Sequence, residues 1–184
     1  MADLPLKIAI ATYGHSAALK DGRVPLDDIA PNFMEINPII AAFRRMVRDV
    51  EFDVCEMAPA TYMIARAAGA PFKALPIFIY RKFHHSGFVY RSGSGIAKPK
   101  DLEGKKVGVR AYSVSTGIWT RGILQNEYGV DLSKITWVVD DEEHVTSLRL
   151  PPNVVHSPPG ESLVSMMASG ALAAAFTGPA GIGR

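Results

Sequence analysis

The sequence predicts an α/β protein built from two lobes. Short β-type runs alternate with helical segments, a pattern typical of a parallel sheet with helices on its faces. A cluster of Gly, Ser and Pro in "SGFVYRSGSGIAKPKDLEG" interrupts this pattern, which then restarts. The 184 residues are 48% hydrophobic, enough to form a core in one large domain or two small lobes. We therefore expect lobe one at residues 1–97 and lobe two at residues 98–184.

Lobe one is expected to contain four strands and two helices. The strands are the runs "LKIAIAT", "FMEI", "FDVC" and "KALPIFIY". Asn37 is the expected N-cap of the first helix, with Pro38 in its first turn. Its apolar face is expected to be Ile39, Phe43, Met46, Val47 and Val50. The second helix begins after Pro59 and ends at Gly69, where a left-handed cap is expected.

Lobe two is expected to contain four strands and two helices. The strands are "KKVGVR", "ITWVV", "NVVHS" and "LAAAFT". A helix is expected at residues 115–128, ended by Gly129, and a shorter one at residues 162–169, ended by Gly170. The apolar face of the longer helix is predicted to be Trp119, Ile123, Leu124 and Tyr128. The acidic run "DDEEH" at residues 140–144 is predicted to be a solvated loop.

Composition excludes several classes of protein. The formal charge is +2 without a basic stripe, so we expect no nucleic-acid partner. The start "MADLPLKIAIATYG" fits neither a signal peptide nor a membrane span, so we expect a cytoplasmic protein. The single cysteine, Cys55, fits a small buried hydrophobe. No His or carboxylate spacing resembles a ligand set, so no metal site is expected.

A cluster of cations interrupts the apolar segment "FIYRKFHHSGFVY" at residues 78–90. Arg81, His84 or His85 could face the hydroxyls of "AYSVSTG" at residues 111–117, where a helix start offers free N–H groups to an anion. The two histidines are consecutive, so at most one should line a cleft. Arg81 could instead pair with Asp53 or Glu56, and the serines could be ordinary helix caps.

Several longer motifs carry a family resemblance. They are "DGRVPLDDIAP", "FRRMVRDVEFDVCEMAPATYMIARAAGAPFKALPIFIYRKFHHS", "DLEGKKVGVRAYSVSTGIWTRGILQNEYGVD" and "ITWV". In this order they resemble the 4,5-dihydroxyphthalate decarboxylase family, which is similar in fold to type 2 periplasmic binding proteins. The resemblance implies a two-lobed structure with a central cleft. It also implies non-oxidative decarboxylation of a dihydroxylated aromatic dicarboxylate, giving protocatechuate, without a cofactor.

The resemblance also suggests a role for each candidate residue. His85 would be the acid that protonates the ring, and Glu56 would be the base that accepts the phenolic proton. Arg81 would bind a carboxylate through two parallel hydrogen bonds. The remaining candidates for contact with an aromatic carboxylate ligand are Tyr13, His84, Ser86, Tyr112, Ser113 and Thr116.

The chain departs from the family pattern in three places. His84 stands where the family usually has Arg, which could make carboxylate binding pH dependent. "Tyr-Gly-His-Ser" at residues 13–16 replaces a motif that usually carries an acid. The chain also stops before the expected return to lobe one, so we expect either a C-terminally truncated product, which we favour, or a diverged short form. Because truncation would expose apolar surface, a homodimer or higher oligomer is expected, and a monomer in light scattering would count against it.

Three functional hypotheses follow from these observations. The first is a decarboxylase of hydroxylated aromatic dicarboxylates. The second is a solute-binding protein of the same fold, which captures a small anionic ligand for an ABC-type transporter without chemistry. The third is an inactive remnant that keeps both lobes without a complete site.

Overall fold

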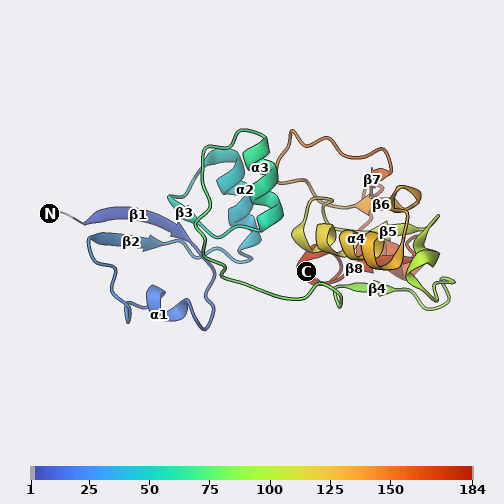
Figure 1. Ribbon diagram of the computed structural model, residues 1–184, viewed down its shortest axis with the longest axis horizontal. Coiled ribbons are helices and arrows are strands. Elements are labelled where there is room, and N and C mark those ends of the chain that lie inside the picture. Colours follow the sequence, from blue (N-terminus) through green and yellow to red (C-terminus); the bar gives the residue numbers. More distant parts are fainter. Residues whose placement is uncertain (1–2, 184) are drawn as a thin grey trace. The chain divides into compact units, whose positions relative to one another are not determined.

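The computed structural model describes residues 3–183, in two compact units that divide between Ile79 and Tyr80 (Figure 1). Each unit has its own sheet and helices, so the predicted α/β class is confirmed. The division falls earlier in the chain than the expected boundary between residues 97 and 98. The reason is that the strand at Phe88–Tyr90 pairs with the strand at Ala174–Phe176 and so belongs to the second unit.

The first unit contains a three-stranded parallel sheet in the order β2-β1-β3. Its elements are β1 (Leu4–Ala9), α1 (Ala17–Lys20), β2 (Ile29–Phe33), α2 (Ile40–Asp49), β3 (Val54–Cys55) and α3 (Pro59–Ala67). Ala9 in the central strand packs with Ala42 and Met46 of α2 and with Phe52. Parallel strands end at the same edge, so the residues after Ala9 and Cys55 lie together.

Three local predictions in this unit were wrong in detail. The second strand is Ile29–Phe33 rather than "FMEI", and its Pro31 is tolerated because β2 is an edge strand that need not donate there. The helix predicted from Asn37 begins at Ile40, and no side chain caps it. The predicted apolar face is only partly right, since Phe43 and Met46 are buried while Val50 is exposed.

The predicted strand "KALPIFIY" does not form. Residues 73–80 have no strand assignment, and within residues 3–183 no strand pairs with them. Leu75, Ile77 and Phe78 remain 64–69% exposed. A β-type sequence becomes a strand only when a partner supplies hydrogen bonds, and Pro76 also removes one donor.

The second unit contains a five-stranded sheet in the order β4-β8-β5-β6-β7, in which only β4 is antiparallel to its neighbour. The strands are β4 (Phe88–Tyr90), β5 (Lys106–Gly108), β6 (Thr136–Val139), β7 (Val154–His156) and β8 (Ala174–Phe176). The helices are α4 (Ser115–Tyr128) and α5 (Leu163–Ser169), with short 3-10 turns η1 (Pro99–Leu102), η2 (Leu132–Lys134) and η3 (Gly178–Ala180). All four strands and both helices predicted for lobe two are present.

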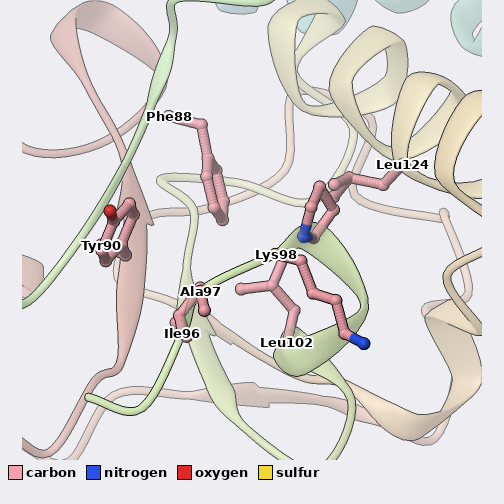
Figure 2. A pocket seen from close by; sticks show the side chains of 8 residues that line it. Phe88, Tyr90, Ile96, Ala97, Lys98, Leu102 and Leu124 are labelled. Carbon is pink, nitrogen blue, oxygen red and sulfur yellow. The ribbon is translucent and has the colours of Figure 1, made fainter.

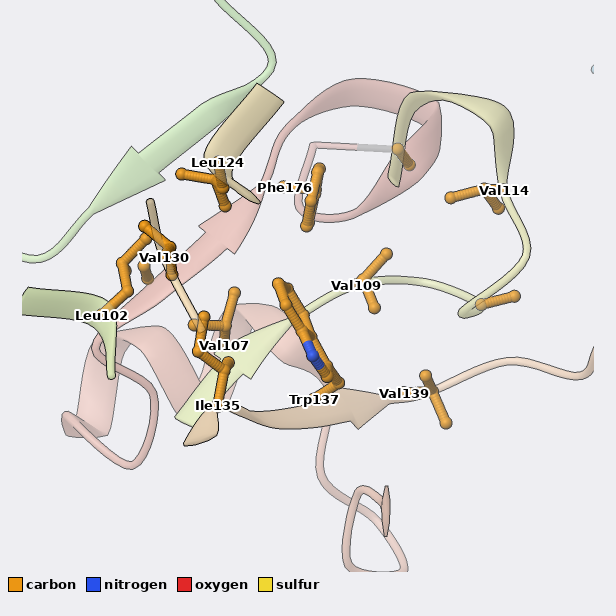
Figure 3. Packing of buried hydrophobic residues seen from close by; sticks show 13 residues of the cluster. Leu102, Val107, Val109, Val114, Leu124, Val130, Ile135, Trp137, Val139 and Phe176 are labelled. Atoms are coloured by element: carbon orange, nitrogen blue, oxygen red, sulfur yellow. The ribbon is translucent and has the colours of Figure 1, made fainter. Parts of the chain in front are cut away.

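The core of the second unit is an apolar cluster around Trp137 and Phe176 (Figure 3). Both rings are fully buried, with centroids 6.3 Å apart. Trp119 was predicted to join this core, but it is 60% exposed, and Tyr128 is 50% exposed. The face of α4 that is buried consists of Gly117, Thr120, Arg121 and Leu124, at the i, i+3, i+4, i+7 spacing of one helical face. The apolar periodicity was therefore right for Leu124 and wrong for Trp119 and Tyr128.

One ion-pair cluster in the first unit makes stability depend on pH. Hydrogen bonds from Arg45 and Lys7 lower the pKa of Glu51 from 4.5 to about 2. Because the folded pKa is below the unfolded value, this stabilisation is present above about pH 4.5 and is lost as pH falls toward 2. We expect the urea midpoint of Glu51→Gln to fall less than that of wild type between these pH values. Equal pH profiles for the two proteins would contradict this expectation.

No helix among residues 3–183 combines the length and apolar character needed to cross a membrane.

Candidate functional site

In the first unit, Tyr13 and Glu56 are in direct contact at the carboxyl edge of the sheet. Glu56 follows β3, and its carboxylate accepts hydrogen bonds from the Tyr13 hydroxyl at 2.7 Å and from the Ala11 N–H at 3.1 Å. The buried hydroxyl of Ser16 accepts the Tyr13 N–H at 2.8 Å and donates to the Ala11 carbonyl at 2.9 Å. The loop after β1 therefore fixes one orientation of the Glu56 carboxylate, as an acid–base residue requires.

His15 and Cys55, which lie near the Tyr13–Glu56 pair, differ in exposure. The ring of His15 stacks on Tyr13 with centroids 5.3 Å apart, and His15 is exposed. Burial raises the pKa of the Cys55 thiol to about 12, and the nearby Glu56 carboxylate adds to this effect. Cys55 is therefore a thiol and not a thiolate near neutral pH. Sequence analysis gave His15 no role in the site, and its position beside Tyr13 followed only from the loop after β1.

In the second unit, His84 lies against α4. Its ring stacks on Trp119 with a centroid distance of 6.2 Å and an interplanar angle of 3°. The Thr120 hydroxyl donates to the His84 carbonyl at 3.4 Å, which ties the segment to the helix. Burial, followed by the charges of Lys82 and His85, lowers the pKa of His84. His84 is therefore neutral at neutral pH, unlike the arginine that the family pattern usually has there.

His85 and its neighbours lie at the surface. The His85 Nε2 is 3.9 Å from the carboxylate of Glu127 on α4, and about half of each side chain is exposed. Arg81, Phe83 and Ser86 are exposed as well. Consecutive histidines thus take different environments, with His84 on Trp119 and His85 toward Glu127.

The start of α4 binds a carboxylate of the protein itself. The N–H groups of Tyr112 and Ser113 donate to Glu143 at 2.6 and 3.1 Å, and the Ser113 hydroxyl also donates to it. The Thr116 side chain packs against Gly87. Its methyl carbon lies 3.3 Å from the position that a Cβ atom would take on this glycine. The structure thus brings Tyr112 and Ser113 together on one carboxylate, whereas Thr116 contacts the segment that holds His84.

Two buried arginines at the same sheet edge were not predicted as site residues. Arg110 is 4% exposed, and its guanidinium donates to the Asp141 carboxylate at 2.7 Å and to the Pro179 carbonyl at 2.9 Å. Arg121 is 6% exposed, and its guanidinium carbon lies 3.7 Å from the Tyr112 ring centroid. Burial lowers the pKa of Arg121, although Tyr112 and Glu143 oppose this effect.

Residues 140–144 form a loop, as predicted, but the prediction that the whole run is solvated was wrong. His144 is 4% exposed, and Asp140, Asp141 and Glu143 are half-buried. These residues follow β6, and the N–H groups of Asp140 and Asp141 donate to the carbonyl of Arg110 after β5. The position of the run directly after a buried parallel strand was the signal that could have indicated a site.

No group of three or more His, Cys, Asp or Glu side chains among residues 3–183 could hold a metal ion. A small pocket of about 150 Å³ lies elsewhere in the second unit (Figure 2). It is lined by Phe88, Tyr90, Ile96, Ala97, Lys98, Pro99, Leu102 and Leu124. Its walls are almost entirely apolar, and it includes none of the predicted site residues. Aromatic carboxylates need converging polar groups, which this pocket lacks.

Comparisons with known proteins identify relatives. Residues 43–148 match the family described as NMT1/THI5 like. The chain is 38% identical over 178 residues to a 4,5-dihydroxyphthalate decarboxylase of Comamonas testosteroni, covering 92% of this chain and 54% of that protein. It is 35% identical over 180 residues to a 4,5-dihydroxyphthalate decarboxylase of Pseudomonas putida, covering 94% of this chain and 69% of that protein.

The extent of these matches supports the predicted resemblance and fold. The chain spans about half the length of the Comamonas protein and 69% of the Pseudomonas protein. The NMT1/THI5-like match agrees with a periplasmic-binding-protein-like α/β fold, and the two sheets of the structure are consistent with it. The chain therefore belongs to the NMT1/THI5-like family, and by its similarity to these two relatives it belongs to the 4,5-dihydroxyphthalate decarboxylase family.

Proposed function

We propose that this chain provides acid–base and carboxylate-binding residues of a decarboxylase that acts on 4,5-dihydroxyphthalate or a related dihydroxylated aromatic dicarboxylate. The observation that carries the proposal is the half-buried Glu56 carboxylate, fixed by the Tyr13 hydroxyl and the Ala11 N–H at the carboxyl edge of a parallel sheet. Ligands of open α/β sheets bind at this edge. The names of the two relatives support the same reaction.

The proposed reaction needs only an acid and a base. Glu56 accepts the proton of the hydroxyl para to the departing carboxylate, and the phenolate electrons move into the ring. His85 donates a proton to the ring carbon that bears this carboxylate. The carbon–carbon bond then breaks, carbon dioxide leaves, and the bond electrons restore the aromatic ring. The proton held by Glu56 returns to the phenolate, and the product is protocatechuate.

The remaining residues would bind and orient the substrate. Arg81, with its exposed guanidinium, binds the carboxylate that is retained, and the Ser86 hydroxyl assists it. Tyr13 and Tyr112 contact the ring, while Ser113 and Thr116 contact a carboxylate. His84 serves as a neutral contact near pH 7, because its lowered pKa removes the charge there. Acidification would add a positive charge at His84, and carboxylate binding would strengthen.

The test is incubation of the purified chain with 4,5-dihydroxyphthalate and chromatographic detection of protocatechuate. We expect product from wild type, a loss of about 10²–10⁴-fold in His85→Ala, and a loss of about 10–100-fold in Arg81→Ala. His156→Ala and Arg149→Ala are matched controls, because both residues are exposed and have no proposed role. Absence of product from wild type would contradict the proposal.

A second outcome of the same experiment would favour a different function. Saturable binding of the dicarboxylate without product would indicate a solute-binding protein, and the carboxylate-binding amides at the start of α4 would suffice for that role.

We also propose that the protein is cytoplasmic and forms a homodimer or larger oligomer. The exposed apolar side chains of Leu75, Ile77 and Phe78 support the assembly, because such surface is usually covered. Light scattering that shows a monomer would contradict this assembly.

A further inference from the structure

The start of α4 already has the geometry of an anion site. Two backbone N–H groups and one hydroxyl, from Tyr112 and Ser113, converge on the carboxylate of Glu143. We refer to Tyr112, Ser113 and Glu143 as the Glu143 cradle. N–H groups that converge at a helix start bind carboxylates and phosphates well, and charge strengthens each hydrogen bond. Glu143 is half-buried and not part of the closed core.

Arg121 gives a second, independent indication of a ligand. Its side chain is 6% exposed, and its Nη2 donates to the Tyr112 carbonyl at 2.8 Å. Its Nη1 has no hydrogen-bond partner within residues 3–183. This nitrogen lies 3.2 Å from the position of a Cβ on Gly117, so it points into the first turn of α4. Buried donors without a partner are rare, and this one lies at the same helix start as the cradle.

The origin of Glu143 also matters. The residue comes from the loop after β6, whereas Tyr112 and Ser113 come from the loop after β5. β5 and β6 are parallel neighbours, so both loops leave the carboxyl edge of the sheet. Ligands of such sheets bind at this edge, in loops that can move without disturbing the strands.

We propose that Glu143 is an internal competitor, whose carboxylate occupies the site of a ligand carboxylate. A ligand carboxylate displaces it, accepts the hydrogen bonds of Tyr112 and Ser113, and is attracted by the positive charge of the buried Arg121 guanidinium, which packs on the Tyr112 ring. This inference rests on the proposed function for the chemical class of the ligand, an aromatic carboxylate. In this proposal Glu143 lowers the affinity for the ligand carboxylate, and the buried Arg121 cation helps to bind that carboxylate.

A purely structural explanation competes with this proposal. Tyr112 and Ser113 directly precede Val114, the N-cap of α4, so Glu143 could serve only as a structural cap for the loop that leads into the helix. A cap stabilises the helix but does not compete with a ligand. Removal of a cap would lower stability and leave carboxylate affinity unchanged, whereas removal of a competitor raises affinity.

The experiment measures benzoate binding to the ¹⁵N-labelled chain by NMR, through the amide shifts of Tyr112 and Ser113. We expect the Kd of Glu143→Ala to be at least about tenfold lower than that of wild type, because the competitor no longer reduces the fraction of open sites. Glu142→Ala is the matched control, because it removes the same charge at the preceding position, where the side chain is exposed. Its Kd should stay within about twofold of wild type.

A double variant tests the location of the site. Adding Ser113→Ala to Glu143→Ala removes one donor and should reverse much of the gain in affinity. Equal benzoate affinity in wild type and Glu143→Ala would overturn the proposal and leave Glu143 as a helix cap. The measurement needs no turnover, so a chain that fails to decarboxylate 4,5-dihydroxyphthalate can still pass or fail this test independently.

Discussion

Glu56→Gln is expected to lower the kcat for 4,5-dihydroxyphthalate by about 10²–10⁴-fold, the range that general acid–base catalysis contributes. Glutamine keeps the size of the side chain, and its amide oxygen can still accept a hydrogen bond. It cannot accept the phenolic proton, so the ring would not gain the electrons that decarboxylation needs. Because the change affects proton transfer, KM should change much less than kcat.

Glu51→Gln is the matched control for this variant. Glu51 is another hydrogen-bonded carboxylate of the first unit, held by Arg45 and Lys7, and it has no proposed catalytic role. Its kcat should equal that of wild type at neutral pH. Tyr13→Phe, which removes the 2.7 Å hydrogen bond to Glu56, should give an intermediate loss. A kcat for Glu56→Gln within about threefold of wild type would exclude Glu56 as the base.

Trp137→Ala is expected to cost about 3–5 kcal/mol of stability, because it leaves a large cavity in a packed core. The Trp137 ring is fully buried, contacts Phe176, and lies 6.3 Å from the Tyr112 ring. It also lies beneath the Arg121 guanidinium, whose carbon is 5.5 Å from the ring centroid. Domains are typically stable by only about 5–15 kcal/mol, so this loss would remove a large part of the stability of a typical domain.

The chain contains two tryptophans, which makes Trp119→Ala a natural control. Trp119 is 60% exposed, and its loss should cost less than about 1 kcal/mol. Urea unfolding followed by circular dichroism compares the two variants, and Trp137→Phe provides a milder change if Trp137→Ala does not fold. A larger cost for Trp119→Ala than for Trp137→Ala would restore the predicted apolar face of α4 and contradict the structure.

Local signals in the sequence were sufficient for most elements of the second unit. The helix predicted at residues 115–128 was confirmed as Ser115–Tyr128, because Gly129 supplies the left-handed cap that ends it. The strands "ITWVV" and "LAAAFT" were confirmed because short apolar runs have few alternatives to burial in a sheet. Alternation of strands and helices likewise sufficed for the α/β class.

The candidate site was only partly predictable. Tyr13 and Glu56 were proposed as site residues, and the structure joins them by a hydrogen bond. Glu143 was assigned to a solvated run, because acidic residues next to one another usually face water. Only the pairing of β5 with β6 brings it to the amides of Tyr112 and Ser113, from a position 30 residues further along the chain than Ser113.

The sequence by itself determined where most elements of the second unit lie, because caps, turns and apolar runs act over a few residues, but it did not predict β4, whose partner β8 lies far along the chain. Tertiary structure alone decided which face of α4 is buried. An arginine is normally a surface residue, but Tyr112 and Trp137 provide aromatic faces that make burial of Arg121 favourable. Tertiary structure also decided that "KALPIFIY" is no strand, since a strand needs a partner that local sequence cannot specify.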